Sequence, residues 1–155
     1  MIFVTIGTHP DQFDRLIRRI DKIAPKIKEE IIVQRGFTKY TPKNIEYFDF
    51  TDKIDEYYKK SRIVIAQSAT SLIEFILKYG KPVITVPREA KYKEHINDHQ
   101  VEFAEYFAKK ANVLMIRNMK ELTPKLLINY RKKPKIDLDG LYNLQDKIRK
   151  VIDSL

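Results

Sequence analysis

The sequence predicts one small α/β domain whose mainly parallel sheet is covered by helices on both faces. Short apolar runs alternate with longer amphipathic segments along the 155 residues, which is typical of right-handed βαβ units. The run from Arg62 to Ala66 is almost wholly apolar, as expected of a strand that is buried on both sides. A chain of this length forms a single domain, which we expect to span residues 1–155.

The expected strands are short segments rich in β-branched and aromatic residues, bounded by turn residues. Six segments have this composition: Met1–Ile6, Glu30–Gln34, Ile45–Phe50, Arg62–Ala66, Pro82–Val86 and Val113–Ile116.

The expected helices carry apolar residues at helical spacing, as at Phe13, Leu16, Ile17 and Ile20 in the first of them. Pro25 ends this first helix. Gly80 follows another, where a left-handed closing residue belongs. The six expected helices are Asp11–Ala24, Asp52–Lys60 with Thr51 as its cap, Ser68–Tyr79, Asn97–Lys110, 118–130 and 139–154.

The composition is that of a globular protein, with 43% hydrophobic and 33% charged residues. The chain has no cysteine, which excludes disulfides and thiolate metal sites. No secretory leader and no apolar run long enough to span a bilayer is visible, so we expect a cytoplasmic protein.

The net charge is +9, but basic and acidic residues are interleaved almost everywhere. The one local concentration comprises Arg131, Lys132, Lys133 and Lys135. This excess is consistent with an ordinary solvated face, and also with attraction to anionic phosphates or lipid headgroups. No zinc-finger or RNA-recognition motif is present, so we expect no nucleic-acid partner.

Ligands of a parallel sheet bind beyond the carboxyl ends of its strands, and three unusual segments occupy that position. The first is Gly7-Thr8-His9, directly after the first strand. Glycine allows a sharp turn or a close approach of the backbone to a ligand, while Thr8 and His9 offer a hydroxyl and an imidazole. The alternative is a plain turn with His9 as a surface histidine.

The second segment leads from the fourth strand into a helix through Ser68, Ala69, Thr70 and Ser71. Small hydroxylated residues leave room for a ligand, and the helix N-terminus suits a diphosphate. The alternative is that Ser68 or Thr70 is an ordinary N-cap of this helix. Glu74 lies farther along among apolar residues, where it would accept hydrogen bonds from ribose hydroxyls or pair with Lys78.

The third segment is a charged loop over residues 88–96 that leads into the helix starting at Asn97. His95 and His99 have helical spacing, which raises the question of a metal site. No third ligand and no HExxH order is evident, so we expect no metal and favour a polar run that hydrogen-bonds a base, sugar or diphosphate. The P-loop, the GxGxxG fingerprint and the nucleophile elbow are absent.

Three stretches together resemble the glycosyltransferase family 28 C-terminal domain, particularly its small stand-alone form of capsular and exopolysaccharide synthesis. They are FVTIGTHPDQFDRLIRRI (3–20), AQSATSLIEFILKYGKPVITVPRE (66–89) and EHINDHQVEFAEYFAKKANVL (94–114). The resemblance extends over residues 1–116, and the expected helices in 117–155 carry no recognisable motif.

This resemblance implies a Rossmann-like domain, the C-terminal donor-binding half of a GT-B glycosyltransferase. It implies inverting transfer of N-acetylglucosamine or another hexose from a UDP-sugar to a lipid-diphosphate-linked acceptor, without a metal or other cofactor. The acceptor-binding half would be a separate membrane-associated subunit that recruits the chain to the cytoplasmic face of the membrane. A non-catalytic donor-binding or regulatory subunit is the alternative, and an RNA- or anionic-lipid-binding protein is a further one.

The resemblance also implies functions for individual residues. Gly7, Thr8 and His9 would face the diphosphate or reacting sugar, with His9 as the one candidate base in this chain. Four residues would hold the diphosphate: Ser68, Ala69, Thr70 and Ser71. Glu74 would accept the ribose hydroxyls, and three residues would contact the donor sugar: Asn97, Asp98 and Gln100.

Two departures from the family pattern concern the donor site. Many relatives have a glycine-rich turn where this chain reads Gln67-Ser68-Ala69-Thr70, and the bulkier side chains narrow the approach to the phosphates. Many also have glycine where this chain has Lys93.

Overall fold

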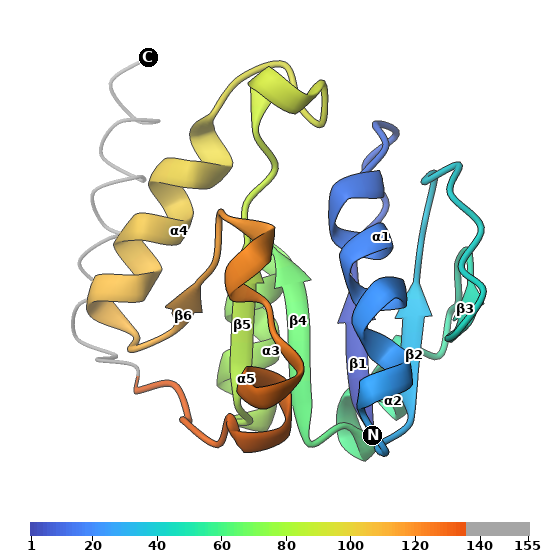
Figure 1. The fold of residues 1–155 in the computed structure, drawn as a ribbon. Coiled ribbons are helices and arrows are strands. Elements are labelled where there is room, and N and C mark those ends of the chain that lie inside the picture. The colour runs from blue at the N-terminus through green and yellow to red at the C-terminus, as the bar shows by residue number, and fades with distance from the viewer. Residues whose placement is uncertain (136–155) are drawn as a thin grey trace, which may run out of the picture.

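The computed structural model describes residues 1–135 and contains, within them, one sheet of six parallel strands (Figure 1). The strands are β1 Ile2–Thr5, β2 Ile31–Gln34, β3 Glu46–Phe48, β4 Ile63–Gln67, β5 Val83–Val86 and β6 Leu114–Met115. Each predicted strand is present, although β3 and β6 are shorter than expected. The expected helix at 139–154 lies outside the described residues.

The strand order is β3-β2-β1-β4-β5-β6. Strands β2 and β3 follow one another on one side of β1. Strand β4 then pairs with the other side of β1, and β5 and β6 extend the sheet in that direction. In the register of the sheet, Phe3 of β1 lies between Ile32 of β2 and Val64 of β4. The connections after β1 and β4 therefore leave to opposite faces, and a crevice opens between them at the carboxyl edge.

Helices cover both faces of this sheet, as the sequence predicts (Figure 1). Alternation along β1 sends Ile2 and Val4 to one face and Phe3 to the other, so each face receives its own apolar cluster. The first cluster packs against α1 Asp14–Ile23 and α5 Pro124–Asn129. The second packs against three helices: α2 Ile54–Lys60, α3 Thr70–Tyr79 and α4 His99–Lys110.

The ends of two helices follow from single residues. Gly80 has φ of 55° and closes α3 in the left-handed conformation, as predicted. The α-helical part of α1 ends at Ile23, and Pro25 lies in the short 3-10 helix η1 Ala24–Lys26 that continues it. Thr51 accepts a hydrogen bond from the N–H of Lys53 at 3.0 Å and does not cap α2, which begins at Ile54.

The expectation of one helix over 118–130 is wrong. The segment forms a 3-10 turn, η3 Met119–Glu121, followed by α5. Pro124 lacks the N–H that a continuous helix needs, and it occupies the first turn of a new helix instead. Thr123 caps this helix by accepting the N–H of Leu126 at 3.1 Å.

Candidate functional site

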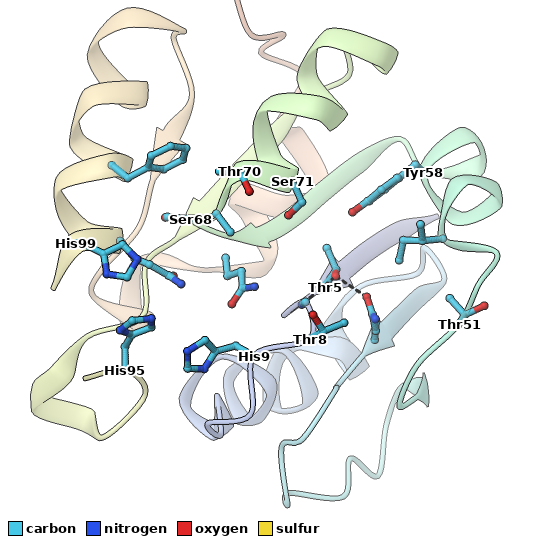
Figure 2. A pocket seen from close by; sticks show the side chains of 17 residues that line it. Thr5, Thr8, His9, Thr51, Tyr58, Ser68, Thr70, Ser71, His95 and His99 are labelled. Carbon is cyan, nitrogen blue, oxygen red and sulfur yellow. Dashed lines mark hydrogen bonds between the residues drawn. The ribbon is translucent and has the colours of Figure 1, made fainter. Parts of the chain in front are cut away.

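A cavity of about 630 Å³ opens at the carboxyl edge of the sheet, between the loops that follow β1 and β4 (Figure 2). The sequence predicts a ligand at this edge, and the strand order shows that the cavity lies at the switch point of the sheet. Eight of the predicted site residues line it: Gly7, Thr8, His9, Ser68, Ala69, Thr70, Ser71 and Gln100. The first two predicted segments therefore meet across the cavity, and the third contributes Gln100 together with His95 and His99.

The first turn of α3 faces this cavity without a side-chain cap. The N-cap position is Ala69, which offers no side-chain acceptor, so neither Ser68 nor Thr70 is the cap. The hydroxyl of Ser68 lies 2.7 Å from that of Thr85 on β5, a buried pairing that turns it into the sheet. The N–H groups of Ala69 and Leu72 already donate to the carbonyl oxygens of Gln67 and Ala69. Those of Thr70 and Ser71 remain to bind an anion, which the helix dipole also favours.

Gly7 is required by the shape of the cavity floor. Its φ of 67° is in the left-handed region, which favours glycine. A Cβ atom added here would lie 2.2 Å from Nε2 of Gln67, the last residue of β4. The loop after β1 and the end of β4 therefore approach as closely as they do because position 7 has no side chain.

Three histidines form a row along one side of the cavity (Figure 2). The ring centroids of His9 and His95 are 4.5 Å apart, and those of His95 and His99 are 4.4 Å apart. The spacing suggested that His95 and His99 share one face of a helix. They do not, because His95 lies before α4 and His99 is its first residue. Among residues 1–135, no group of three or more His, Cys, Asp or Glu is arranged to hold a metal ion.

Hydrogen bonds to Nδ1 make these imidazoles unequal. The N–H of Asp11 donates to Nδ1 of His9 at 3.2 Å, and that of Asn97 donates to Nδ1 of His95 at 3.4 Å. When neutral, both rings therefore carry their proton on Nε2. His99 is the opposite case, because its Nδ1 contacts the side-chain oxygen of Asn97, an oxygen that also accepts the backbone N–H of His99.

The cavity favours neutral histidines. Burial lowers the pKa of His9 below 6.5, and the positive charge of Arg88 lowers it further. The carboxylate of Asp11, 3.7 Å from Nδ1, offsets part of this shift. Burial likewise lowers the pKa of His95, with the neighbouring His9 contributing. The lowered pKa values favour the uncharged form of both rings at neutral pH.

Arg88 lies beneath the cavity with no exposed surface, which the sequence did not indicate. Its guanidinium donates to the carbonyl oxygens of Ile6, Asp11 and Gln12 in the loop after β1, at 3.2, 2.9 and 3.0 Å. It also donates to the carbonyl oxygen of Glu94 at 3.2 Å. Burial lowers the pKa of Arg88 to about 10, so the side chain stays charged at neutral pH.

Three charged residues of the expected loop over 88–96 are thus buried, while Lys91 to Lys93 and Ile96 are exposed. The loop contains the 3-10 turn η2 Ala90–Tyr92, and Glu89 and Glu94 are as buried as Arg88. Both oxygens of Glu94 accept from Arg15 of α1 at 2.9 Å, and Glu89 accepts from Arg117 at 2.7 Å. Paired charges can be buried in this way because each is hydrogen-bonded to a partner.

Three predicted site residues lie outside the cavity lining. Glu74 is exposed on α3, in a small cavity of about 110 Å³ that shares Ile54, Tyr58 and Ser71 with the main one. Lys78, the alternative partner of Glu74, pairs with Asp55 instead.

Asn97 and Asp98 point to their own loop. The side chain of Asn97 contacts His99, and that of Asp98 accepts the N–H of Ala90 at 2.8 Å. Because Asp98 is at the N-cap position, α4 begins at His99 and not at Asn97.

Sequence reasoning did not assign several side chains of the lining to the site: Thr5, Gln34, Thr51, Ile54, Tyr58, Gln67, His95, His99 and Phe103. Three of them, Thr5, Gln34 and Gln67, end strands at the carboxyl edge, and that position is a sequence signal for them. Thr5 and Gln34, the last residues of β1 and β2, hydrogen-bond each other at 2.7 Å.

The basic stretch 131–135 begins at the opposite end of the sheet (Figure 1). Tyr130, just before it, donates to the carbonyl oxygen of Val83, the first residue of β5, at 3.2 Å. Its own carbonyl oxygen accepts from Arg62, the residue before β4. Within residues 1–135, no helix has the length and apolar character needed to cross a bilayer.

The glycosyltransferase family 28 C-terminal domain matches residues 1–136, beyond the limit at 116 that the sequence suggested. The fold is similar to MurG of Acinetobacter baumannii, with a TM-score of 0.55, 16% identity, and coverage of 81% of this chain and 38% of MurG. It is also similar to the kitacinnamycin glycotransferase, with a TM-score of 0.56, 13% identity and coverage of 81% and 32%.

None of the curated proteins matches the chain. The α/β sheet has the architecture of the C-terminal half of GT-B glycosyltransferases, and the chain spans well under half the length of either enzyme. With the family match covering nearly all of its residues, the chain belongs to the glycosyltransferase family 28 C-terminal domain family.

Proposed function

We propose that this chain is the donor-binding and catalytic subunit of an inverting glycosyltransferase that uses a UDP-sugar. The observation that carries the proposal is the uncapped N-terminus of α3, which opens into the switch-point cavity opposite Gly7. A helix N-terminus with free N–H groups suits a diphosphate. Family membership supports a nucleotide-sugar as the bearer of that diphosphate.

The donor would occupy the cavity in three parts. Its diphosphate would lie against the N–H groups and hydroxyls of Thr70 and Ser71, with Gly7 and Thr8 on the other side. The uridine would extend toward α2, where the small cavity brings its ribose hydroxyls to Glu74. The sugar would lie toward the histidine row and Gln100.

Transfer breaks the bond between the anomeric carbon and the diphosphate, and UDP leaves with the electron pair. The acceptor hydroxyl forms the new bond on the opposite face of the sugar and gives up its proton to a base. The free N–H groups of α3 stabilise the charge that develops on UDP. His9 is our candidate base, acting through Nε2 once its proton is on Nδ1, a tautomer that the Asp11 carboxylate favours.

The acceptor would be bound by another protein. The cavity is open at the carboxyl edge of the sheet, so a second protein surface can cover it. We therefore propose a membrane-associated partner subunit that carries a lipid-diphosphate-linked acceptor and closes the cavity against water. Asn97 and Asp98 would reach the donor sugar only if their loop rearranged on closure.

A non-catalytic donor-binding subunit is the second candidate. One observation favours it: the acceptor nitrogen of neutral His9 is already used by the N–H of Asp11. In that case the base belongs to the partner, and this chain supplies the donor alone.

Calorimetry with UDP and UDP-sugars tests the proposal, first on the chain and then on its complex with a partner encoded by a neighbouring gene. We expect UDP to bind and a sugar to be transferred to a lipid-diphosphate acceptor by the complex only. Absence of UDP binding in both samples contradicts the donor site. Normal UDP binding together with normal transfer by a His9→Ala complex means that His9 is not the base, as the non-catalytic alternative requires.

A further inference from the structure

The side chain of Gln67 holds an unused hydrogen-bond donor at the floor of the cavity. Its Oε1 accepts from Nε of Arg88 at 2.6 Å. Because a guanidinium only donates, this bond fixes which way the amide is turned. The NH2 group is left on the side of Gly7, where a Cβ atom would come within 2.2 Å of Nε2 but 3.9 Å of Oε1.

Within residues 1–135, the NH2 group of Gln67 has no acceptor. Gln67 lines the cavity and is 7% exposed. Two buried side-chain polar atoms of the described residues have neither a hydrogen-bond partner nor contact with solvent, and neither of them belongs to Gln67. The donor therefore faces the cavity between Gly7 and the first turn of α3. A ligand with an acceptor oxygen at that point would complete its hydrogen bonding.

Arg88 adds a positive charge directly behind this amide. Its hydrogen bonds all end on neutral oxygens, four of the main chain and one of Gln67. The nearby Glu94 carboxylate is engaged by Arg15, and no carboxylate among the described residues forms an ion pair with Arg88. The carboxylates of Glu94 and Asp11 therefore act on Arg88 only at longer range, and a buried cation without a contacting ion-pair partner favours an anion in the adjoining cavity.

We infer that Gln67 is a specificity-determining residue that donates to the β-phosphate of the donor, and that Arg88 is a positioning residue that orients and polarises this amide. The inference rests on the proposed function, because it requires a nucleoside diphosphate in the cavity. It assigns the diphosphate a side-chain contact in addition to the backbone N–H groups of α3.

The test is the affinity of the full chain for UDP and for UMP, measured by calorimetry on the wild type and on Gln67→Ala. UMP lacks the β-phosphate, so we expect Gln67→Ala to weaken UDP binding about tenfold and UMP binding by less than about twofold. Gln34→Ala is the matched control, since Gln34 lines the same cavity but bonds Thr5 and not Arg88. It should keep the wild-type ratio of the two affinities.

Arg88→Lys tests the positioning part, with circular dichroism to confirm the fold. We expect it to lower the UDP affinity with little effect on UMP, and to add little to Gln67→Ala in the double variant. If Arg88→Lys does not fold, NMR of the wild type tests the contact directly. The side-chain NH2 resonances of Gln67 should then shift on addition of UDP and not on addition of UMP.

The outcomes separate the two levels of inference. If the wild type binds neither nucleotide, the proposed function fails and the Gln67 contact fails with it. If the wild type binds UDP and Gln67→Ala binds it equally well, only the Gln67 contact is wrong. The contact is also wrong if Gln67→Ala binds UDP and UMP with equally reduced affinity. A loss of affinity for UDP-N-acetylglucosamine alone overturns it as well, because Gln67 would then contact the sugar and not the β-phosphate.

Discussion

The backbone N–H of Asp11 donates to Nδ1 of His9 while the carboxylate of the same residue lies 3.7 Å from that nitrogen. Asp11 therefore contacts His9 with a donor and an acceptor at once. The N–H stabilises the tautomer protonated on Nε2, and the carboxylate stabilises the tautomer protonated on Nδ1. Only the second leaves Nε2 able to take a proton from an acceptor hydroxyl.

Replacing Asp11 with asparagine should slow sugar transfer without weakening UDP binding. Asp11→Asn keeps the backbone N–H and removes the charge that favours the Nδ1 tautomer. We expect kcat of the partner complex to fall about tenfold, less than the roughly 100-fold or greater loss expected for His9→Gln. An unchanged kcat in both variants would assign the base to the partner or to His99, whose Nε2 is free to accept.

Transfer by the complex should persist at pH values where an ordinary histidine is charged. Burial and Arg88 lower the pKa of His9 below 6.5, so the neutral ring survives to more acidic pH. NMR titration of the His9 ring should give a midpoint below pH 6.5, and kcat/KM should fall as the pH is lowered through the same range. A midpoint at or above 6.5 contradicts the assigned surroundings of His9.

Glu74 is predicted to distinguish ribose from deoxyribose. If it accepts the ribose hydroxyls, wild-type chain should bind UDP about tenfold more tightly than 2′-deoxy-UDP, and Glu74→Ala should bind both equally. Lys78→Ala is the matched control, because Lys78 pairs with Asp55 and not with Glu74. Unequal binding of the two nucleotides by Glu74→Ala would remove Glu74 from the site.

The sheet and the position of the cavity were predictable from sequence because they depend on local patterns. Runs such as Ile63–Gln67 are apolar throughout and bury every residue, and parallel strands bring the loops after β1 and β4 to one edge. The order of the strands, and with it the switch point, depends on pairings that no local pattern contains.

The buried charges were missed for a related reason. Arg88, Glu89 and Glu94 occur in a strongly charged stretch, which is typical of an exposed loop. They are buried because Arg15, far away in sequence, supplies a partner for Glu94, and the loop after β1 supplies carbonyl oxygens for Arg88. The position of His95 before the helix was likewise decided by Asp98, which turns back to Ala90 and delays the start of α4.

Asp21 offers a test of the fold that is independent of the donor site. It is 3% exposed on α1, and its carboxylate accepts the hydroxyl of Tyr40 and the N–H groups of Lys43 and Asn44. Burial alone would raise its pKa, but these hydrogen bonds outweigh burial and hold the pKa below its ordinary value of 3.8.

Because the folded state holds this carboxylate ionised, Asp21 stabilises the fold above pH 3.8, and the contribution disappears as the pH falls through the lowered pKa. We expect Asp21→Asn to lower the free energy of unfolding by about 1–3 kcal/mol at pH 7 in urea titrations. Tyr40→Phe removes one of the three bonds and should cost about 1 kcal/mol. The deficit of Asp21→Asn should shrink as the pH approaches 3, whereas a deficit of the same size at pH 7 and pH 3 would mean that Asp21 acts through packing and not through its charge.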